Sequence, residues 1–166
     1  NQYDIIDMPS GPVENLLFEK FIDTDVVRVK KNRLKYYHRT GWIEITVGVL
    51  GGEQMKILNP SITVAEGEVL SVEEKFQGGT GVNITPPPRE IISRNVLERT
   101  KKLIKKLGQK LLIQGYSRID AFVNVKNGDV MIIEVNTLPG LTPSTVLYHQ
   151  ALAEKSAIFP QMLLEK

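Results

Sequence analysis

The sequence contains no cysteine, no long run of apolar residues and almost no net charge. Without cysteine it can form neither a disulfide framework nor a cysteine-ligated zinc site, and it has no thiolate nucleophile. No apolar stretch approaches the roughly 18–20 residues that a membrane-spanning helix needs, so we expect no membrane partner. The 21 Lys and Arg residues nearly balance the 19 Asp and Glu residues, which gives no reason to expect nucleic acid as a partner.

The chain does have enough apolar residues for one core. They make up 42% of its 166 residues, which predicts a single domain over residues 1–166. Residues 42–50 alternate strictly between apolar and polar and predict a half-buried strand. Its inner face carries Ile43, Ile45, Val47 and Val49.

Residues 89–107 predict one long helix that stops at Gly108. Its apolar face carries Ile92, Val96, Leu103 and Leu107, with Leu97 and Ile104 beside them. Further strands are expected at 16–22, 26–29 and 34–36 (these two as a hairpin), and in short pieces between 53 and 64. Residues 65–88 are rich in glycine and proline and predict a loop.

Two alternating segments, 117–125 and 129–136, predict a hairpin whose turn length decides which residues pair. A two-residue turn would put Asp120 on the same face as Val135, whereas a three-residue turn over 126–128 pairs Asp120 with Glu134. We expect the three-residue turn, with Val125 opposite Asp129, because it collects the apolar residues of both strands on one face. These residues are Ile119, Ala121, Val123, Met131, Ile133 and Val135. The same turn suits Gly128 in the left-handed conformation.

This register predicts that Arg118, Asp120, Glu134 and Asn136 meet at one polar end of the hairpin. Asp, Glu and Asn supply hard oxygen ligands, and adjacent carboxylates repel unless a cation lies between them, so Mg²⁺ is the natural candidate. Arg118 could hold a phosphate or a carboxylate by a bidentate contact. The alternative is that these are solvated charges on a strand face.

The segment after this hairpin predicts a capped helix over 146–153. Thr142 is a good N-cap and Pro143 a good first helical residue. Gly140 lets the backbone approach a ligand closely, and the Ser144 and Thr145 hydroxyls flank the helix start. Directly after the metal-ligand strand, this favours a pocket for a substrate carboxylate, although a capped helix is the more common meaning of such a pattern.

Two motifs now carry a resemblance to a known family. Arg118-Ile119-Asp120 followed by Glu134-Val135-Asn136-Thr137-Leu138-Pro139-Gly140-Leu141-Thr142-Pro143 resembles the C-terminal signature of the D-alanine–D-alanine ligases, within the ATP-grasp superfamily. Phe18-Glu19-Lys20-Phe21-Ile22 resembles the nucleotide hinge strand of that family, and Glu74-Lys75-Phe76 the start of its mobile active-site loop. The implied fold is α+β: an ATP-grasp C-terminal subdomain, mostly an antiparallel sheet with helices packed on one side.

The resemblance implies a nucleotide and metal site. Glu19 would contact the adenine amino group, and the main chain of the hinge residues Lys20, Phe21 and Ile22 would read the ring edge. Glu44 would bind the ribose hydroxyls. The ligands of two Mg²⁺ ions (with Mn²⁺ as an alternative), which bridge the ATP phosphates, would be Asp120, Glu134 and Asn136.

The resemblance also implies the reaction, a step of peptidoglycan synthesis in which ATP phosphorylates one D-alanine and a second amine displaces the phosphate. Arg118 would stabilise charge on the acyl phosphate, and Gly140 would complete the oxyanion environment. Lys75 would close over the phosphates, and Thr145, beside Ser144, would hold the second carboxylate. The implied setting is the cytoplasm, or a plastid in a photosynthetic source, and the full-length enzyme could be a homodimer.

Three departures from the family pattern keep alternatives open. Phe76 stands where the family usually carries Tyr or His, so the acceptor could be D-serine, D-lactate or another group in place of D-alanine. Residues 23–41 form a basic insertion, either a solvated hairpin or the partner surface of a non-catalytic interaction module. The N-terminal and central ligase domains do not precede residue 1, so we expect a C-terminal lobe that is inactive alone and needs those domains as partners.

Overall fold

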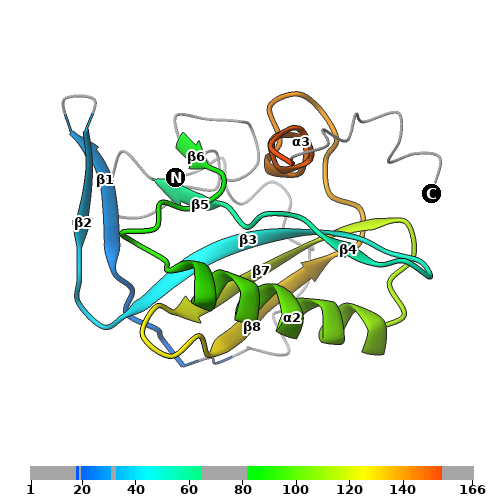
Figure 1. Cartoon of the computed structure of the whole chain (residues 1–166), viewed down its shortest axis with the longest axis horizontal. Coiled ribbons are helices and arrows are strands. Elements are labelled where there is room, and N and C mark those ends of the chain that lie inside the picture. The colour runs from blue at the N-terminus through cyan, green and yellow to red at the C-terminus, as the bar shows by residue number, and fades with distance from the viewer. Residues whose placement is uncertain (1–17, 19, 31–32, 65–81, 155–166) are drawn as a thin grey trace, which may run out of the picture.

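The computed structural model describes residues 18, 20–30, 33–64 and 82–154. Four antiparallel strands make its central sheet, in the spatial order β4–β3–β7–β8 (Figure 1). They are β4 (Lys56–Ile57), β3 (Trp42–Leu50), β7 (Tyr116–Asn124) and β8 (Val130–Asn136). Two-stranded antiparallel sheets are formed by β1 (Val26–Lys30) with β2 (Arg33–Tyr37) and by β5 (Ile62–Val64) with β6 (Val82–Ile84). The predicted α+β class with an antiparallel sheet is confirmed.

The predicted alternation of β3 is confirmed, and it gives the central sheet two different faces. The inner-face residues Ile43, Ile45, Val47 and Val49 are at most 4% exposed and belong to the main apolar core. Trp42, Glu44 and Thr46 point to the opposite face and are half-buried. One face of β3 therefore supports the core, and the other is available for polar chemistry.

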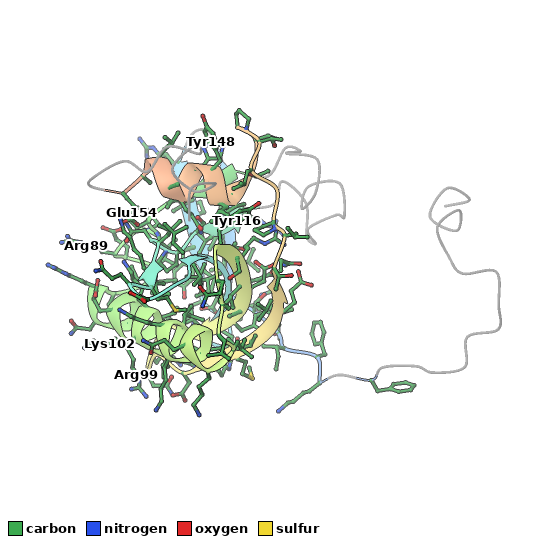
Figure 2. All side chains as sticks on the ribbon, turned by 90° about the vertical axis from the view of Figure 1, so that its right-hand side faces the viewer. Arg89, Arg99, Lys102, Tyr116, Tyr148 and Glu154 are labelled. Carbon is green, nitrogen blue, oxygen red and sulfur yellow. The ribbon has the colours of Figure 1, made fainter. Side chains whose placement is uncertain are left out.

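Helix α2 (Arg94–Lys110) packs on the core face of the sheet. Ser93 caps its start, since the Ser93 hydroxyl accepts a hydrogen bond from the Val96 amide at 3.3 Å. The buried positions of the helix are spaced four residues apart: Val96, Thr100, Ile104 and Gly108. Figure 2 shows the side chains of Arg99 and Lys102 on the other side of the helix, pointing away from the sheet.

Three predictions about α2 are wrong. The helix begins at Arg94 and not at residue 89, because Ser93 caps its start, so Ile92 precedes the helix. Leu103 is 41% exposed, because the buried stripe runs through Thr100 and Ile104 instead. Gly108 does not stop the helix, which continues to Lys110. A Cβ atom at Gly108 would lie 2.8 Å from the Met55 sulfur, so this glycine serves the close approach of the helix to the chain beside β4.

Helix α3 (Val146–Leu152) packs on the face of β3 opposite α2 (Figure 2). A Cβ atom on Gly48, which alternates with Thr46 and Leu50, would lie 2.5 Å from Leu147 Cδ1. The prediction that the helices pack on one side is therefore wrong. The reason is that β3 ends in small and apolar residues on both faces, and a second apolar cluster forms there.

The predicted helix over 146–153 is confirmed to within one residue, but its N-cap is Thr145 and not Thr142. The Thr142 carbonyl instead accepts hydrogen bonds from the Thr145 amide at 2.9 Å and from the Thr145 hydroxyl at 2.8 Å. These bonds close a turn before the helix, so the helix begins at Val146.

Other segments differ from the prediction because a strand forms only where a second strand is available to pair with it. The predicted buried strand at 16–22 is wrong for its described part, where Phe18 and Phe21 are 88% and 86% exposed and no described strand pairs with them. The predicted hairpin at 26–36 is confirmed as β1 and β2. Of the predicted 65–88 loop, residues 65–81 lie outside the described residues and 82–84 form β6, because β5 offers a partner edge. None of the helices in the described part of the chain is long and apolar enough to cross a membrane.

Candidate functional site

The polar faces of three strands meet at one place on the central sheet. Asp120 of β7 pairs with Glu134 of β8 on one side and with Thr46 of β3 on the other. Arg118 pairs with Asn136 two residues along the same strands. Because residues paired across antiparallel strands point to the same face, the register gathers these five side chains on the face opposite α2. We call these five residues the polar cluster.

The register that brings Asp120 to Glu134 arises differently from the prediction. The turn has four residues, 125–128, since the Asn124 amide donates to the Asp129 carbonyl at 2.8 Å, and the predicted pairing of Val125 with Asp129 is wrong. A β-bulge between Asp120 and Ala121 then restores the predicted pairing of Asp120 with Glu134.

The bulge inserts Ile133 as an extra residue of β8. Its side chain is 42% exposed, so the prediction that Ile133 lies on the buried face is wrong. Gly128 has a φ of +73°, which confirms its predicted left-handed conformation.

Asp120 lies deepest in the polar cluster and is 8% exposed. One carboxylate oxygen accepts a hydrogen bond from the Thr46 hydroxyl at 2.8 Å. The other accepts from Arg118 Nη2 at 2.9 Å, from Arg118 Nε at 3.2 Å and from Asn136 Nδ2 at 3.3 Å. Burial raises the pKa of the Asp120 carboxyl, and Glu134 acts in the same direction, against the lowering effect of Arg118 and Thr46. The positive charge of Arg118 therefore compensates the cost of burying the Asp120 carboxylate.

Arg118 joins the two carboxylates of the cluster. Its Nη2 atom lies 3.5 Å from Glu134 Oε1, and Asn136 Nδ2 donates to the same oxygen at 2.8 Å. The side chains of Arg118 and Asp120 are 19% and 11% exposed, whereas that of Glu134 is 52% exposed. The cluster is thus buried at Asp120 and open to solvent at Glu134. A charged group from the solvent can therefore reach the cluster at Glu134.

The donor set fits a divalent cation that keeps other ligands. No group of three or more His, Asp or Glu side chains within the described ranges lies close enough to hold a metal ion. The polar cluster offers two carboxylates and one amide, whose oxygen takes the place of its nitrogen when the Asn136 amide turns by 180°. Mg²⁺ is usually bound by one or two carboxylates together with waters and phosphate oxygens, so Asp120, Glu134 and Asn136 suit Mg²⁺ with a phosphate ligand.

Thr46 is the member of the cluster that the sequence did not reveal. Its hydroxyl holds Asp120, but the two residues are 74 positions apart and meet only because β3 pairs with β7. Glu44 lies two residues along β3 on the same face, opposite Phe122 of β7. Two residues of a strand span about 6.6 Å, so Glu44 lies next to the polar cluster. A molecule bound at the polar cluster could therefore also reach Glu44.

The other predicted site residues are placed less fully. Gly140, Ser144 and Thr145 lie between β8 and α3, and a Cβ on Gly140 would lie 2.9 Å from Thr145 Cγ2. The Ser144 hydroxyl lies 3.1 Å from that of Thr142. These contacts lie within the segment, so its role toward a substrate carboxylate stays a prediction.

The predicted hinge and loop residues complete the set. Lys20 and Phe21 are exposed and Ile22 is half-buried, and their role toward adenine also stays a prediction. Glu19, Lys75 and Phe76 lie outside the described residues.

Comparison with known families and structures finds the same relatives throughout. Residues 38–165 match the family model described as D-ala D-ala ligase C-terminus. The D-alanine–D-alanine ligase of Syntrophobacter fumaroxidans is 34% identical over 132 residues, which cover 78% of this chain and 39% of that protein. The D-alanine–D-alanine ligase of Leptospira interrogans is 36% identical over 116 residues, which cover 67% of this chain and 32% of that protein. The matched regions thus span 39% and 32% of the length of these two relatives.

Solved structures agree on the fold. The D-alanine–D-alanine ligase of Bacillus anthracis complexed with ATP superposes with a TM-score of 0.51 at 25% identity, over 80% of this chain and 38% of that one. The VanG D-Ala:D-Ser ligase of Enterococcus faecalis gives a TM-score of 0.55 at 22% identity, over 78% of this chain and 36% of that one. These neighbours are ATP-grasp ligases, which confirms the fold implied by the sequence motifs.

Proposed function

Because this chain belongs to the D-alanine–D-alanine ligase family through its C-terminal domain, we propose that it supplies the metal and phosphate half of an ATP-dependent ligase. The observation that carries the proposal is the polar cluster, where Arg118 lies against both Asp120 and Glu134 at the open polar face of the sheet. The reaction proposed is the joining of D-alanine to a second amino acid through an acyl phosphate. The compartment proposed is the cytoplasm, which supplies the ATP that the reaction consumes.

In the proposed reaction, a carboxylate oxygen of the first D-alanine attacks the γ-phosphorus of ATP, and ADP leaves. The amine of the second amino acid then attacks the carbonyl carbon, loses a proton, and phosphate leaves. Such transfers depend mainly on positioning and on neutralising charge, so side chains need supply little covalent chemistry. Asp120, Glu134 and Asn136 would hold Mg²⁺, which neutralises charge on the phosphates when bound.

The chain's own residues have separate tasks in this proposal. Thr46 keeps Asp120 oriented by its 2.8 Å hydrogen bond. Arg118, already 2.9 Å from Asp120 Oδ2, would turn toward a transferring phosphate as its carboxylate partners take up the cation. Glu44 would accept hydrogen bonds from the ribose. Lys75, Phe76, Gly140, Ser144 and Thr145 keep their predicted roles toward the phosphates and the two amino acids, with D-serine or D-lactate as further acceptors.

Calorimetric titration of this chain with ATP, with and without Mg²⁺, tests the site directly. We expect Mg²⁺-dependent binding that Asp120→Asn or Glu134→Gln weakens by about tenfold or more, because each removes one charged oxygen donor. Asp129→Asn is the matched control: it removes a carboxylate that directly follows the turn of the same hairpin, outside the polar cluster. Equal affinities for all four proteins, or binding that ignores Mg²⁺, would contradict the site.

A second experiment tests the reaction. We expect the isolated chain to release no phosphate from Mg-ATP and D-alanine, because more than half of the length of each relative lies outside the matched region. Fusing the chain to the preceding domains of a family member should restore phosphate release that depends on Arg118. Steady phosphate release by the isolated chain would refute the proposal that it needs the preceding domains. If Arg118→Ala left phosphate release by the fusion unchanged, the proposed role of Arg118 would be refuted.

A further inference from the structure

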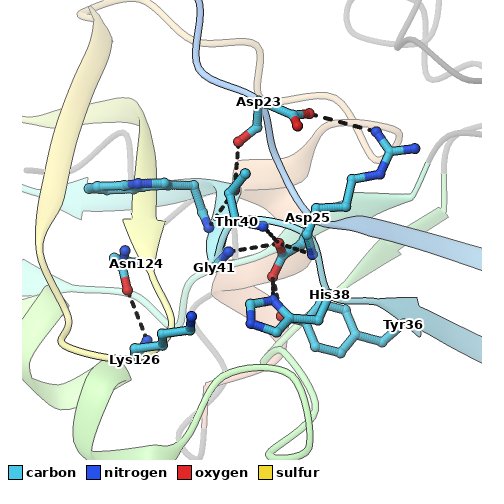
Figure 3. A network of polar contacts seen from close by, with 10 residues as sticks. Asp23, Asp25, Tyr36, His38, Thr40, Gly41, Asn124 and Lys126 are labelled. Carbon is cyan, nitrogen blue, oxygen red and sulfur yellow. Dashed lines mark hydrogen bonds and ion pairs between the residues drawn. The ribbon is translucent and has the colours of Figure 1, made fainter.

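Asp25 holds together the chain that leads into β3 (Figure 3). One oxygen of its carboxylate accepts hydrogen bonds from the amides of Arg39, Thr40 and Gly41, each at 2.8 Å. The other oxygen accepts from the Tyr36 hydroxyl and lies 3.0 Å from His38 Nδ1. The Asp25 side chain is fully buried, so five donors converge on one enclosed carboxylate. The backbone from residue 39 to residue 41 is therefore held in one conformation.

The residue that this backbone presents is Trp42. Its carbonyl accepts a hydrogen bond from the Asp25 amide at 2.7 Å, and its amide donates to the Thr40 hydroxyl at 3.3 Å. The preceding carbonyl, that of Gly41, accepts from the Val125 amide at 2.8 Å. The start of β3 is thus held by backbone hydrogen bonds from the chain on either side of the strand.

Trp42 lies on the face of β3 that carries the polar cluster. It alternates with the buried Ile43 and shares its face with Glu44 and Thr46, and all three of these outer residues are half-buried. Across β7 it stands opposite Asn124, next to the half-buried Phe122. An indole that is only half-covered, on a backbone held by these hydrogen bonds, offers an aromatic surface for contact with another molecule.

The order of residues along β3 and β7 corresponds to the order of groups in a nucleotide. The carboxylates and Arg118 stand at the Thr46 level, Glu44 is about 6.6 Å further along, and Trp42 is about 13 Å from Thr46. If the phosphates occupy the polar cluster and a sugar reaches Glu44, the base comes beyond Glu44, at Trp42. Aromatic rings stack on bases of any sequence, because every base has a π face.

We propose that Trp42 is the stacking surface for the purine base of the nucleotide bound at this face. The proposal rests on the proposed function. It assigns a contact with the purine base to Trp42, which directly follows the 23–41 insertion. Because Trp42 is the single tryptophan of the chain, the tryptophan emission comes from Trp42 alone and changes when its surroundings change.

The test titrates this chain with Mg-ATP and with Mg-tripolyphosphate, following tryptophan emission and, by calorimetry, affinity. We expect Mg-ATP to quench or shift the emission and Mg-tripolyphosphate to bind without doing so. Trp42→Leu should weaken Mg-ATP about tenfold, Trp42→Phe less than about threefold, and neither should change the affinity for tripolyphosphate, since stacking needs a ring and not apolar volume. Thermal unfolding of each variant checks that it folds.

The outcomes separate this inference from the function on which it rests. Mg-ATP binding without an emission change, and with equal affinities for Trp42→Leu, Trp42→Phe and the unaltered protein, would overturn the role of Trp42 and leave the metal and phosphate site unaffected. A loss of affinity for tripolyphosphate in Trp42→Leu would also overturn it, because that loss would show damage to the phosphate end. Failure of the unaltered chain to bind either ligand would refute both.

Discussion

Replacing Asp25 by asparagine tests whether one buried carboxylate stabilises the start of β3. The substitution keeps the shape of the side chain and one acceptor oxygen for the amides of residues 39–41. It removes the negative charge and places an NH₂ donor where the Tyr36 hydroxyl and His38 Nδ1 now converge. We therefore expect Asp25→Asn to fold and to be less stable than the unaltered protein.

The magnitude follows from the pKa of Asp25. Burial alone would raise this pKa, but the hydrogen bonds from Tyr36 and from the amides of Gly41, Arg39 and Thr40 outweigh burial and lower it from 3.8 to about 2. A pKa unit corresponds to 1.36 kcal/mol, so the ionised carboxylate contributes about 2 kcal/mol to the free energy of unfolding. Because the folded pKa lies below the unfolded one, the contribution is complete above pH 5 and disappears as the pH falls through 4 toward 2. About half of it remains at pH 3.

Urea unfolding of both proteins at pH 7, 4 and 3 measures this contribution. The difference in unfolding free energy should fall from about 2 kcal/mol at pH 7 to about 1 kcal/mol at pH 3, while the other carboxyls, common to both proteins, cancel. Asp23→Asn is the control, because Asp23 is half-exposed and only 3.6 Å from Arg39 in a surface ion pair, and it should change stability by less than about 0.5 kcal/mol. A difference that stays constant from pH 7 to pH 3, or an Asp25→Asn protein as stable as the original, would refute the reasoning.

Further predictions concern Thr46 and two glycines. Thr46→Val removes the hydroxyl that holds Asp120 while keeping the side-chain shape, and it should weaken Mg-ATP about fivefold in calorimetry; unchanged affinity would show that the hydroxyl has no part in orienting Asp120. Gly48→Ala should lower the free energy of unfolding by about 2 kcal/mol or more in urea, because the new Cβ would lie 2.5 Å from Leu147 Cδ1. Gly115→Ala should cost only about 1 kcal/mol, since its φ of +64° strains alanine but its surroundings are empty; equal costs for the two glycines would refute the packing argument.

Local patterns in the sequence were enough to predict features that depend only on residues close together in the chain, such as the face of a strand on which a side chain lies. The alternation over 42–50 places four apolar side chains on the core face of β3, and the structure keeps them there. The spacing of Arg118, Asp120, Glu134 and Asn136 on two alternating segments predicted their meeting, although the structure reaches this pairing through a four-residue turn and a bulge. Strand periodicity is a short-range property, so side chains two residues apart share a face wherever the strand lies.

Long-range packing decided what the sequence alone could not. The exposed position of Ile133 depends on a bulge in β8, and the close packing of Gly108 in α2 involves Met55 of another segment. The contact of Thr46 with Asp120 exists only because β3 pairs with β7. These contacts join residues tens of positions apart, and no local pattern encodes which edge or face another segment will cover. The sequence by itself therefore determined the chemical groups of this site and their order along each strand, and the tertiary structure decided which strands bring them together.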